Sequence, residues 1–155
     1  MLEALYRTLN HQLPLSLILV LLIAHMVGDF ILQSDWMALN KGKRWDALSL
    51  HVGVYIAVVS LIIAAFQPPS PYPYAELWQF GGWVLVNGVA HFVTDAITSR
   101  VTSRLWFLPQ VGQGMRPTWI QVEVKDTRHW FFVAIGADQL LHYIVLFTTA
   151  QWWLR

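Results

Sequence analysis

The sequence predicts an all-α integral membrane protein, a four-helix bundle with both termini outside the cytoplasm. Hydrophobic residues make up 56% of the 155 residues and charged residues only 12%, against about 25% charged in soluble proteins. Four apolar stretches are each long enough to cross the bilayer, since a helix needs roughly 20 residues to span about 30 Å of hydrocarbon. Nine tryptophans suit the headgroup region, where an amphipathic ring is stable.

The chain is predicted to be one membrane domain, residues 1–155, with helices at about 15–34, 47–66, 77–99 and 130–153. The apolar run of the first helix follows Arg7, as in a signal peptide. No small-residue cleavage pattern comes after it, and apolar residues continue past His25. We therefore expect a spanning helix there and not a cleaved leader.

Each remaining helix is bounded by residues typical of linkers. The second follows the basic segment 41–44 and ends before the proline-rich segment 68–73. The third is followed by a connection over 100–129, which is long enough to form a lid or a short interfacial element.

The distribution of Lys and Arg predicts the orientation. The first and third linkers contain eight of these residues, whereas the N-terminal segment, the second linker and the C-terminal tail contain two. Because basic residues collect on the cytoplasmic side, those two linkers are predicted to be cytoplasmic and both termini external. This corresponds to a multi-pass protein of a bacterial inner membrane.

Composition also narrows the partners. The net charge is only +1 and the basic residues are scattered, so nucleic acid is not an expected partner, whereas membrane lipid is. A homo-oligomer stays open. The chain has no cysteine, so any metal must be bound by imidazole, carboxylate or amide groups.

Three of the predicted helices contain a histidine and an aspartate four residues apart, which places each pair on one helical face. The pairs are His25 with Asp29, His91 with Asp95, and Asp138 with His142. The fourth helix runs opposite to the first and third, and its pair is written in reverse order. All three aspartates are therefore predicted at one depth, nearer the cytoplasm than the histidines. His51, one turn into the second helix, lies near that level.

These buried ionisable groups indicate a metal centre. Such groups cost about 2.5–3.5 kcal/mol each at membrane depth and normally face a bundle interior. Imidazole and carboxylate without thiolate suit a divalent transition ion, Zn or Mn first. Three carboxylates contribute −3 and two dications +4, which favours two ions over one. The predicted metal ligands are His25, Asp29, His51, His91, Asp95, Asp138 and His142.

Other polar residues receive simpler interpretations. Neutral groups that extend the same helical faces are predicted to orient the ligands; they are Gln33, Tyr55 and Asn87. Charged groups near the linkers are interpreted as solvated, namely Asp35, Lys41 and Asp46. The alternative for the His/Asp pairs is a hydrogen-bonded network that only fixes helix register.

The motifs together resemble a known group of proteins. The residues HMVGDFILQ from His25 (HxxGDFxxQ), the HxxxD motif from His91 and the DQxxH motif from Asp138, with the isolated His51, resemble an uncharacterised family of small bacterial and phage membrane proteins over nearly the whole chain. A weaker likeness is to membrane-bound metal-dependent hydrolases. That second resemblance implies a reaction class and nothing about a substrate.

The leading functional prediction is metal-dependent hydrolysis of a lipid or lipid-linked phosphate near the cytoplasmic leaflet. His51 and Asp138 are the predicted catalytic residues, with His51 as a further ligand or as general base, and metal-bound water as nucleophile. The alternatives are a proton or divalent-metal transport component, a haem or oxidative di-metal protein, and a noncatalytic membrane subunit.

Overall fold

The computed structural model describes residues 13–66, 73–113 and 128–153, and these contain helices and no strand. The prediction of an all-α protein is therefore confirmed for the described part of the chain. The elements in order are α2 (Leu15–Met26), the π-helix η1 (Val27–Ile31), α3 (Asp35–Asn40), α4 (Trp45–Phe66), α5 (Pro73–Gln113) and α6 (Arg128–Trp153).

The first predicted helix does not continue as one α-helix to residue 34. It widens into η1, where the Leu32 amide donates to the Val27 carbonyl five residues earlier, at 2.9 Å. The chain then turns into the short helix α3. Ser34 caps α3, because its Oγ accepts a hydrogen bond from the Met37 amide at 3.3 Å, and Asp35 lies in the positive first turn.

The other three helices contain the predicted ranges and extend beyond them. α4 begins at Trp45, where the Asp46 carboxylate accepts a hydrogen bond from the Ala47 amide at 3.0 Å. α5 begins with Pro73, a favoured first residue, and reaches Gln113 instead of ending near residue 99. The first part of the predicted third linker is thus helical, while its residues 114–127 lie outside the described part.

Within the residues that the structure describes, two helices are long and apolar enough to cross a membrane, Trp45–Phe66 and His129–Gln151. Leu15–Ile31 is also apolar but shorter.

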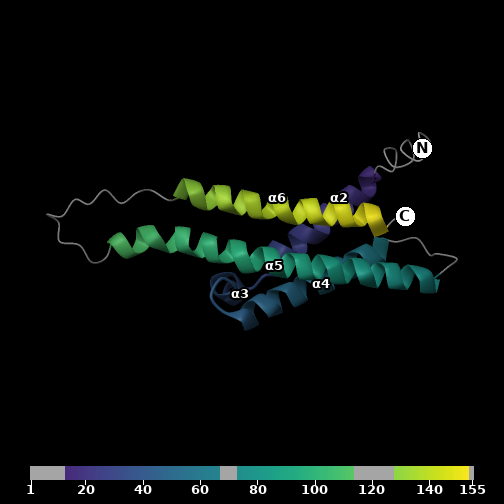
Figure 1. Ribbon diagram of the computed structural model, residues 1–155, viewed down its shortest axis with the longest axis horizontal. Coiled ribbons are helices and arrows are strands. Elements are labelled where there is room, and N and C mark those ends of the chain that lie inside the picture. The colour runs from purple at the N-terminus through teal and green to yellow at the C-terminus, as the bar shows by residue number, and fades with distance from the viewer. Residues whose placement is uncertain (1–12, 67–72, 114–127, 154–155) are drawn as a thin grey trace.

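The long helices lie roughly along one direction (Figure 1). α5 and α6 run side by side and antiparallel, and α4 crosses α5 at an angle and contacts it. α2 contacts both α4 and α6, while η1 and α3 contact α4. The start of α2 and the end of α6 lie at the same end of the molecule.

A mainly apolar core fills that same end. Its buried members come from α2, α4, α5 and α6 and are Leu21, Ala24, Tyr55, Val59, Ile63, Trp83, Leu146, Ala150 and Trp153. Asn87 adds a buried polar group nearby, and it donates to the Trp83 carbonyl and to Thr149 Oγ1 at 2.8 and 2.9 Å. Polar side chains accumulate on the other side of this core, toward α3.

Candidate metal centre

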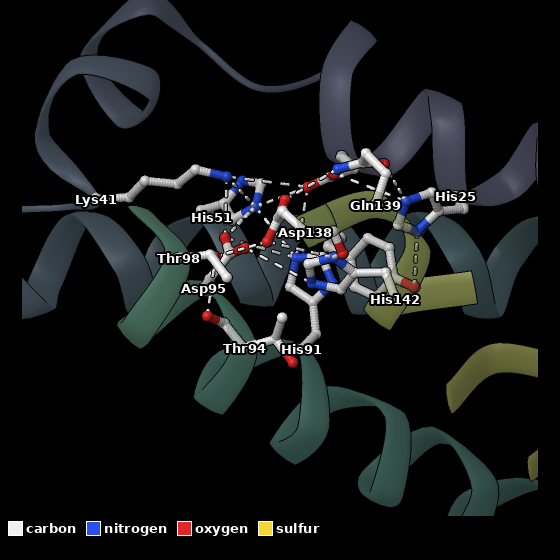
Figure 2. A network of polar contacts seen from close by, with 12 residues as sticks. His25, Lys41, His51, His91, Thr94, Asp95, Thr98, Asp138, Gln139 and His142 are labelled. Carbon is white, nitrogen blue, oxygen red and sulfur yellow. Dashed lines mark hydrogen bonds and ion pairs between the residues drawn. The ribbon is translucent and has the colours of Figure 1, made fainter. Parts of the chain in front are cut away.

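The structure brings all seven predicted ligands into one cluster at the junction of α2, η1, α4, α5 and α6 (Figure 2). Six are buried, with 0–4% of each residue exposed, and they are His25, Asp29, His51, His91, Asp95 and His142. The side chain of Asp138 is 13% exposed. Helical spacing alone aligned each pair, and helix packing aligned the pairs with one another.

Four residues form a first group that could hold a metal ion. They are Asp29, His51, His91 and Asp95, each with one ligand atom within 4.8 Å of the others. His51 Nε2 lies 3.0 Å from Asp29 Oδ1 and 3.1 Å from Asp95 Oδ2. His91 Nε2 lies 3.4 Å from the same Asp29 oxygen. Two carboxylates and two imidazoles therefore surround one small volume.

Asp95, Asp138 and His142 form a second such group. His142 Nδ1 is bound to the Asp138 main-chain carbonyl at 2.9 Å, which directs Nε2 toward Asp95 Oδ1 at 3.6 Å. Asp95 thus belongs to both groups and directs one carboxylate oxygen to each. A carboxylate in this position can bridge two ions.

Buried polar atoms without hydrogen-bond partners support the interpretation of the cluster as a cation site. Within the described part of the chain, Asp95 Oδ1 and His142 Nε2 are buried without a hydrogen-bond partner and lie 3.6 Å apart. A buried polar atom without a partner costs about 1–3 kcal/mol. A divalent ion accepts lone pairs from both a carboxylate oxygen and an imidazole nitrogen, so the residues present fit a metal. The buried His/Asp groups could hold an ion, and the identity of that ion stays open.

The interpretation of Lys41 as a solvated linker residue is wrong, because its side chain lies in the cluster. Its Nζ donates to Asp95 Oδ2 at 2.9 Å and lies 3.2 Å from His51 Nε2 and 4.0 Å from Asp29 Oδ1. The turn after α3 returns the chain to the cluster, and the side chain is only 16% exposed. Ser34 and Asp35 were the sequence signal for the start of α3, as a helix cap and first-turn acid.

With Lys41 included, the charge count changes. Three aspartates contribute −3 and Lys41 +1, so the cluster with neutral imidazoles totals −2. One divalent ion neutralises this charge, and two ions leave +2. A second ion therefore makes the centre attractive to a doubly charged anion.

His25 lies at the side of the cluster, outside both metal-capable groups. Its Nε2 lies 2.9 Å from Gln139 Oε1, and its Nδ1 lies 3.2 Å from the Tyr55 hydroxyl. A neutral ring satisfies both contacts, with Nε2–H donating to Gln139 and Nδ1 accepting from Tyr55. Both ring nitrogens of His25 are thus occupied by Tyr55 and Gln139, so His25 positions these side chains, whereas the six other candidates belong to the metal-capable groups.

Two further side chains position the ligands. Gln139 belongs to the DQxxH motif but was not predicted to contact the ligands. Its Nε2 donates to Asp29 Oδ2 at 2.9 Å and to Asp138 Oδ2 at 3.1 Å. Tyr55 stacks on His91 with ring centroids 3.8 Å apart. The role predicted for Tyr55 agrees with this contact, whereas Asn87 hydrogen-bonds away from the cluster.

A cavity of about 290 Å³ adjoins the cluster between η1, α3, α5 and α6. Three cluster residues, Asp29, Lys41 and Asp138, line it, together with Gln139. Thr98 on α5 also lines it and donates to Asp138 Oδ1 at 2.5 Å. The cavity gives a ligand access to the candidate metal centre.

Comparison with known proteins identifies a family and no activity. A family model described as "Protein of unknown function (DUF3307)" matches residues 17–154. No curated protein and no solved structure matches. The match includes all the residues of the cluster.

Proposed function

We propose that this chain, which belongs to the DUF3307 family, is a membrane-embedded metal-dependent hydrolase acting on a lipid or lipid-linked phosphate. We place it in the bacterial inner membrane as a four-helix bundle with both termini outside. Two helices of sufficient length and apolarity support a membrane location, and the eight-to-two division of basic residues supports the orientation.

The sharing of Asp95 between two metal-capable groups is the observation that most supports hydrolysis. Paired divalent ions are common in phosphatases, where they stabilise the attacking and leaving oxygens. A closed structural site needs four ligands and usually contains thiolates. This cluster has more potential ligands than that, no thiolate, and a cavity at one side.

The residues divide into holding and reacting groups by burial. His51 and His91 are buried together with Asp29 and Asp95, and these four residues are suited to hold an ion. Asp138 is the more exposed carboxylate and lines the cavity, so it is placed to accept a proton from water or to orient it. We therefore assign the general base to Asp138 before His51. A bound ion would supply activation of water and offset charge on phosphoryl oxygens.

The apolar core favours hydrolysis over transport. Among the described residues, the buried side chains on the far side of His25 and His91 are apolar except Asn87. Transport of an ion or proton needs polar groups or water along the whole path. The polar groups described here reach the cluster from the α3 side and end there.

The test compares two Asp→Asn substitutions in purified protein. Asp95→Asn removes the shared carboxylate, and Asp46→Asn changes an exposed residue paired with Arg44. We expect one or two equivalents of Zn or Mn in the unmodified protein and in Asp46→Asn, and hydrolysis of a lipid-phosphate panel by both. Asp95→Asn should lose metal and activity while remaining monodisperse. Metal-free protein whose melting temperature and activity do not respond to added Zn or Mn would overturn the proposal.

A further inference from the structure

We propose that the cavity beside the metal centre binds an amphiphile that has one phosphate group on one hydrocarbon chain, with the phosphate toward Asp138 and the chain toward the surface. This inference rests on the proposed function and specifies its substrate class. The volume of about 290 Å³ is at the lower end of the range for ligand pockets, about 300–1,000 Å³. It suits one headgroup with the start of one chain.

One side of the cavity is polar. Four hydroxyl side chains on successive turns of α5 line it, and they are Thr98, Ser99, Thr102 and Ser103. Their spacing places them on one helical face, which begins one turn beyond Asp95. Thr98 donates to Asp138 and Thr102 to the Ser99 carbonyl, while the hydroxyls of Ser99 and Ser103 could donate to phosphoryl oxygens without adding charge. This side therefore matches a headgroup next to the metal centre.

The apolar part of the lining comes from other elements. It is formed by Phe30 of η1, Leu39 of α3, and Phe131 and Ile135 of α6. Phe30 and Leu39 are 44% and 60% exposed, so the apolar lining continues onto the outer surface. Inorganic phosphate would not pack against these apolar side chains, whereas a hydrocarbon chain would.

An unpaired amide indicates a ligand in the polar part. Gln33 lines the cavity, and its Oε1 is buried without a hydrogen-bond partner in the described residues. The amide can accept from a hydroxyl of a headgroup, or turn and donate to a phosphoryl oxygen. A bound headgroup would satisfy this atom.

Lys41 gives the headgroup a positive partner once the centre is loaded. It lines the cavity and now compensates the charge of Asp95 at 2.9 Å. An ion bound to Asp95 makes that compensation unnecessary, because the cluster charge rises from −2 to 0 or +2. The ammonium group can then turn toward an anion in the cavity.

Two matched tryptophan substitutions on α6 test the cavity. Ile135→Trp fills the apolar part of the cavity. Ile144→Trp introduces the same side chain at a position of α6 that is 50% exposed and does not line the cavity. Metal-loaded proteins in one detergent would be titrated by calorimetry with decyl phosphate, butyl phosphate, decanol and inorganic phosphate. The metal content of each protein is measured separately.

We expect decyl phosphate to bind at least tenfold more tightly than decanol and inorganic phosphate. A buried methylene contributes about 0.8 kcal/mol, or about fourfold in affinity, so butyl phosphate should bind more weakly than decyl phosphate. Ile135→Trp should lose at least tenfold in decyl phosphate affinity with unchanged metal content, and Ile144→Trp should lose none.

Equal binding of inorganic and decyl phosphate would overturn the assignment, as would full affinity in Ile135→Trp. If Ile135→Trp does not fold, the comparison of butyl with decyl phosphate on the unmodified protein decides, and equal affinities contradict the assignment. Decyl phosphate binding by a protein that holds no metal would instead overturn the proposed hydrolase while supporting the cavity assignment.

Discussion

Lys41 neutralises part of the charge that three aspartates bring to a buried cluster. Its ammonium group lies within 4.0 Å of both Asp29 and Asp95, where two metal-capable groups meet. A unit charge at that distance is worth about 4 kcal/mol at an effective dielectric constant of about 20. The lysine therefore stabilises the metal-free cluster and opposes an incoming ion.

Lys41→Ala is expected to have opposite effects on metal affinity and on the stability of the metal-free protein. Removal of the competing charge should tighten Zn or Mn binding about tenfold or more. Without metal, the melting temperature should fall, because loss of one partner from a buried ion pair costs about 3–5 kcal/mol. Metal titration and thermal unfolding would measure the two effects.

Lys43→Ala is the control, since it removes the same charge from an exposed residue of the same turn. Both quantities should stay close to those of the unmodified protein. Weaker metal binding in Lys41→Ala would contradict the competition between the lysine and the ion.

Helical spacing was enough to select the three His/Asp pairs, and the depth of His51 added a seventh ligand, but neither predicted all the contacts of the cluster. A separation of four residues reveals a shared face within one helix, so the three His/Asp pairs could be read directly. Lys41 reaches the cluster from a turn, and Gln139 crosslinks Asp29 with Asp138 from a neighbouring face. Such contacts depend on the chain path and on helix rotation, which a sequence pattern does not contain.

At the scale of elements, the turn after α3 is packed tightly against α5. A Cβ added at Gly42 would lie 2.4 Å from Ser103 Oγ and 2.5 Å from the Ser99 carbonyl oxygen. The second of these atoms belongs to the backbone and cannot rotate away. Gly42 therefore allows the close approach that places its neighbour Lys41 in the cluster.

Gly42→Ala is expected to move this turn away from α5 and to lower the free energy of unfolding by about 1–3 kcal/mol, as overpacked sites do. Gly53→Ala is the control, because a Cβ on α4 at that position meets no atom within 4 Å. There, alanine should leave stability unchanged or raise it by up to about 1 kcal/mol through helix propensity. Chemical denaturation in detergent would compare the two, and equal stabilities would contradict the close packing.

The helix boundaries were predicted least well where a helix extends beyond its apolar stretch or ends within it. Apolar length sets the predicted end of the third helix near residue 99. No proline or glycine occurs between 100 and 108, so the backbone hydrogen bonds continue past residue 99, and α5 includes Pro109 before it ends at Gln113. For α3, the cap at Ser34 was present in the sequence but lay inside a stretch assigned to one spanning helix.

For the whole molecule, the proposed orientation predicts opposite labelling of two linkers. The chain has no cysteine, so Lys43→Cys and Ser70→Cys each introduce a single thiol. A membrane-impermeant maleimide added to intact cells should label position 70, and position 43 only after the membrane is opened. Labelling of position 43 from outside would reverse the proposed topology.

The position of the apolar core also determines from which end of the molecule an ion can reach the cluster. Polar side chains connect it with the α3 end, while Leu21, Val59, Trp83 and Leu146 fill the other end. In the proposed orientation, an ion entering from the cytoplasm leaves by the same route and completes no passage across the membrane. The transmembrane voltage would then drive no net current through this centre, and its ion would exchange with the cytoplasmic pool.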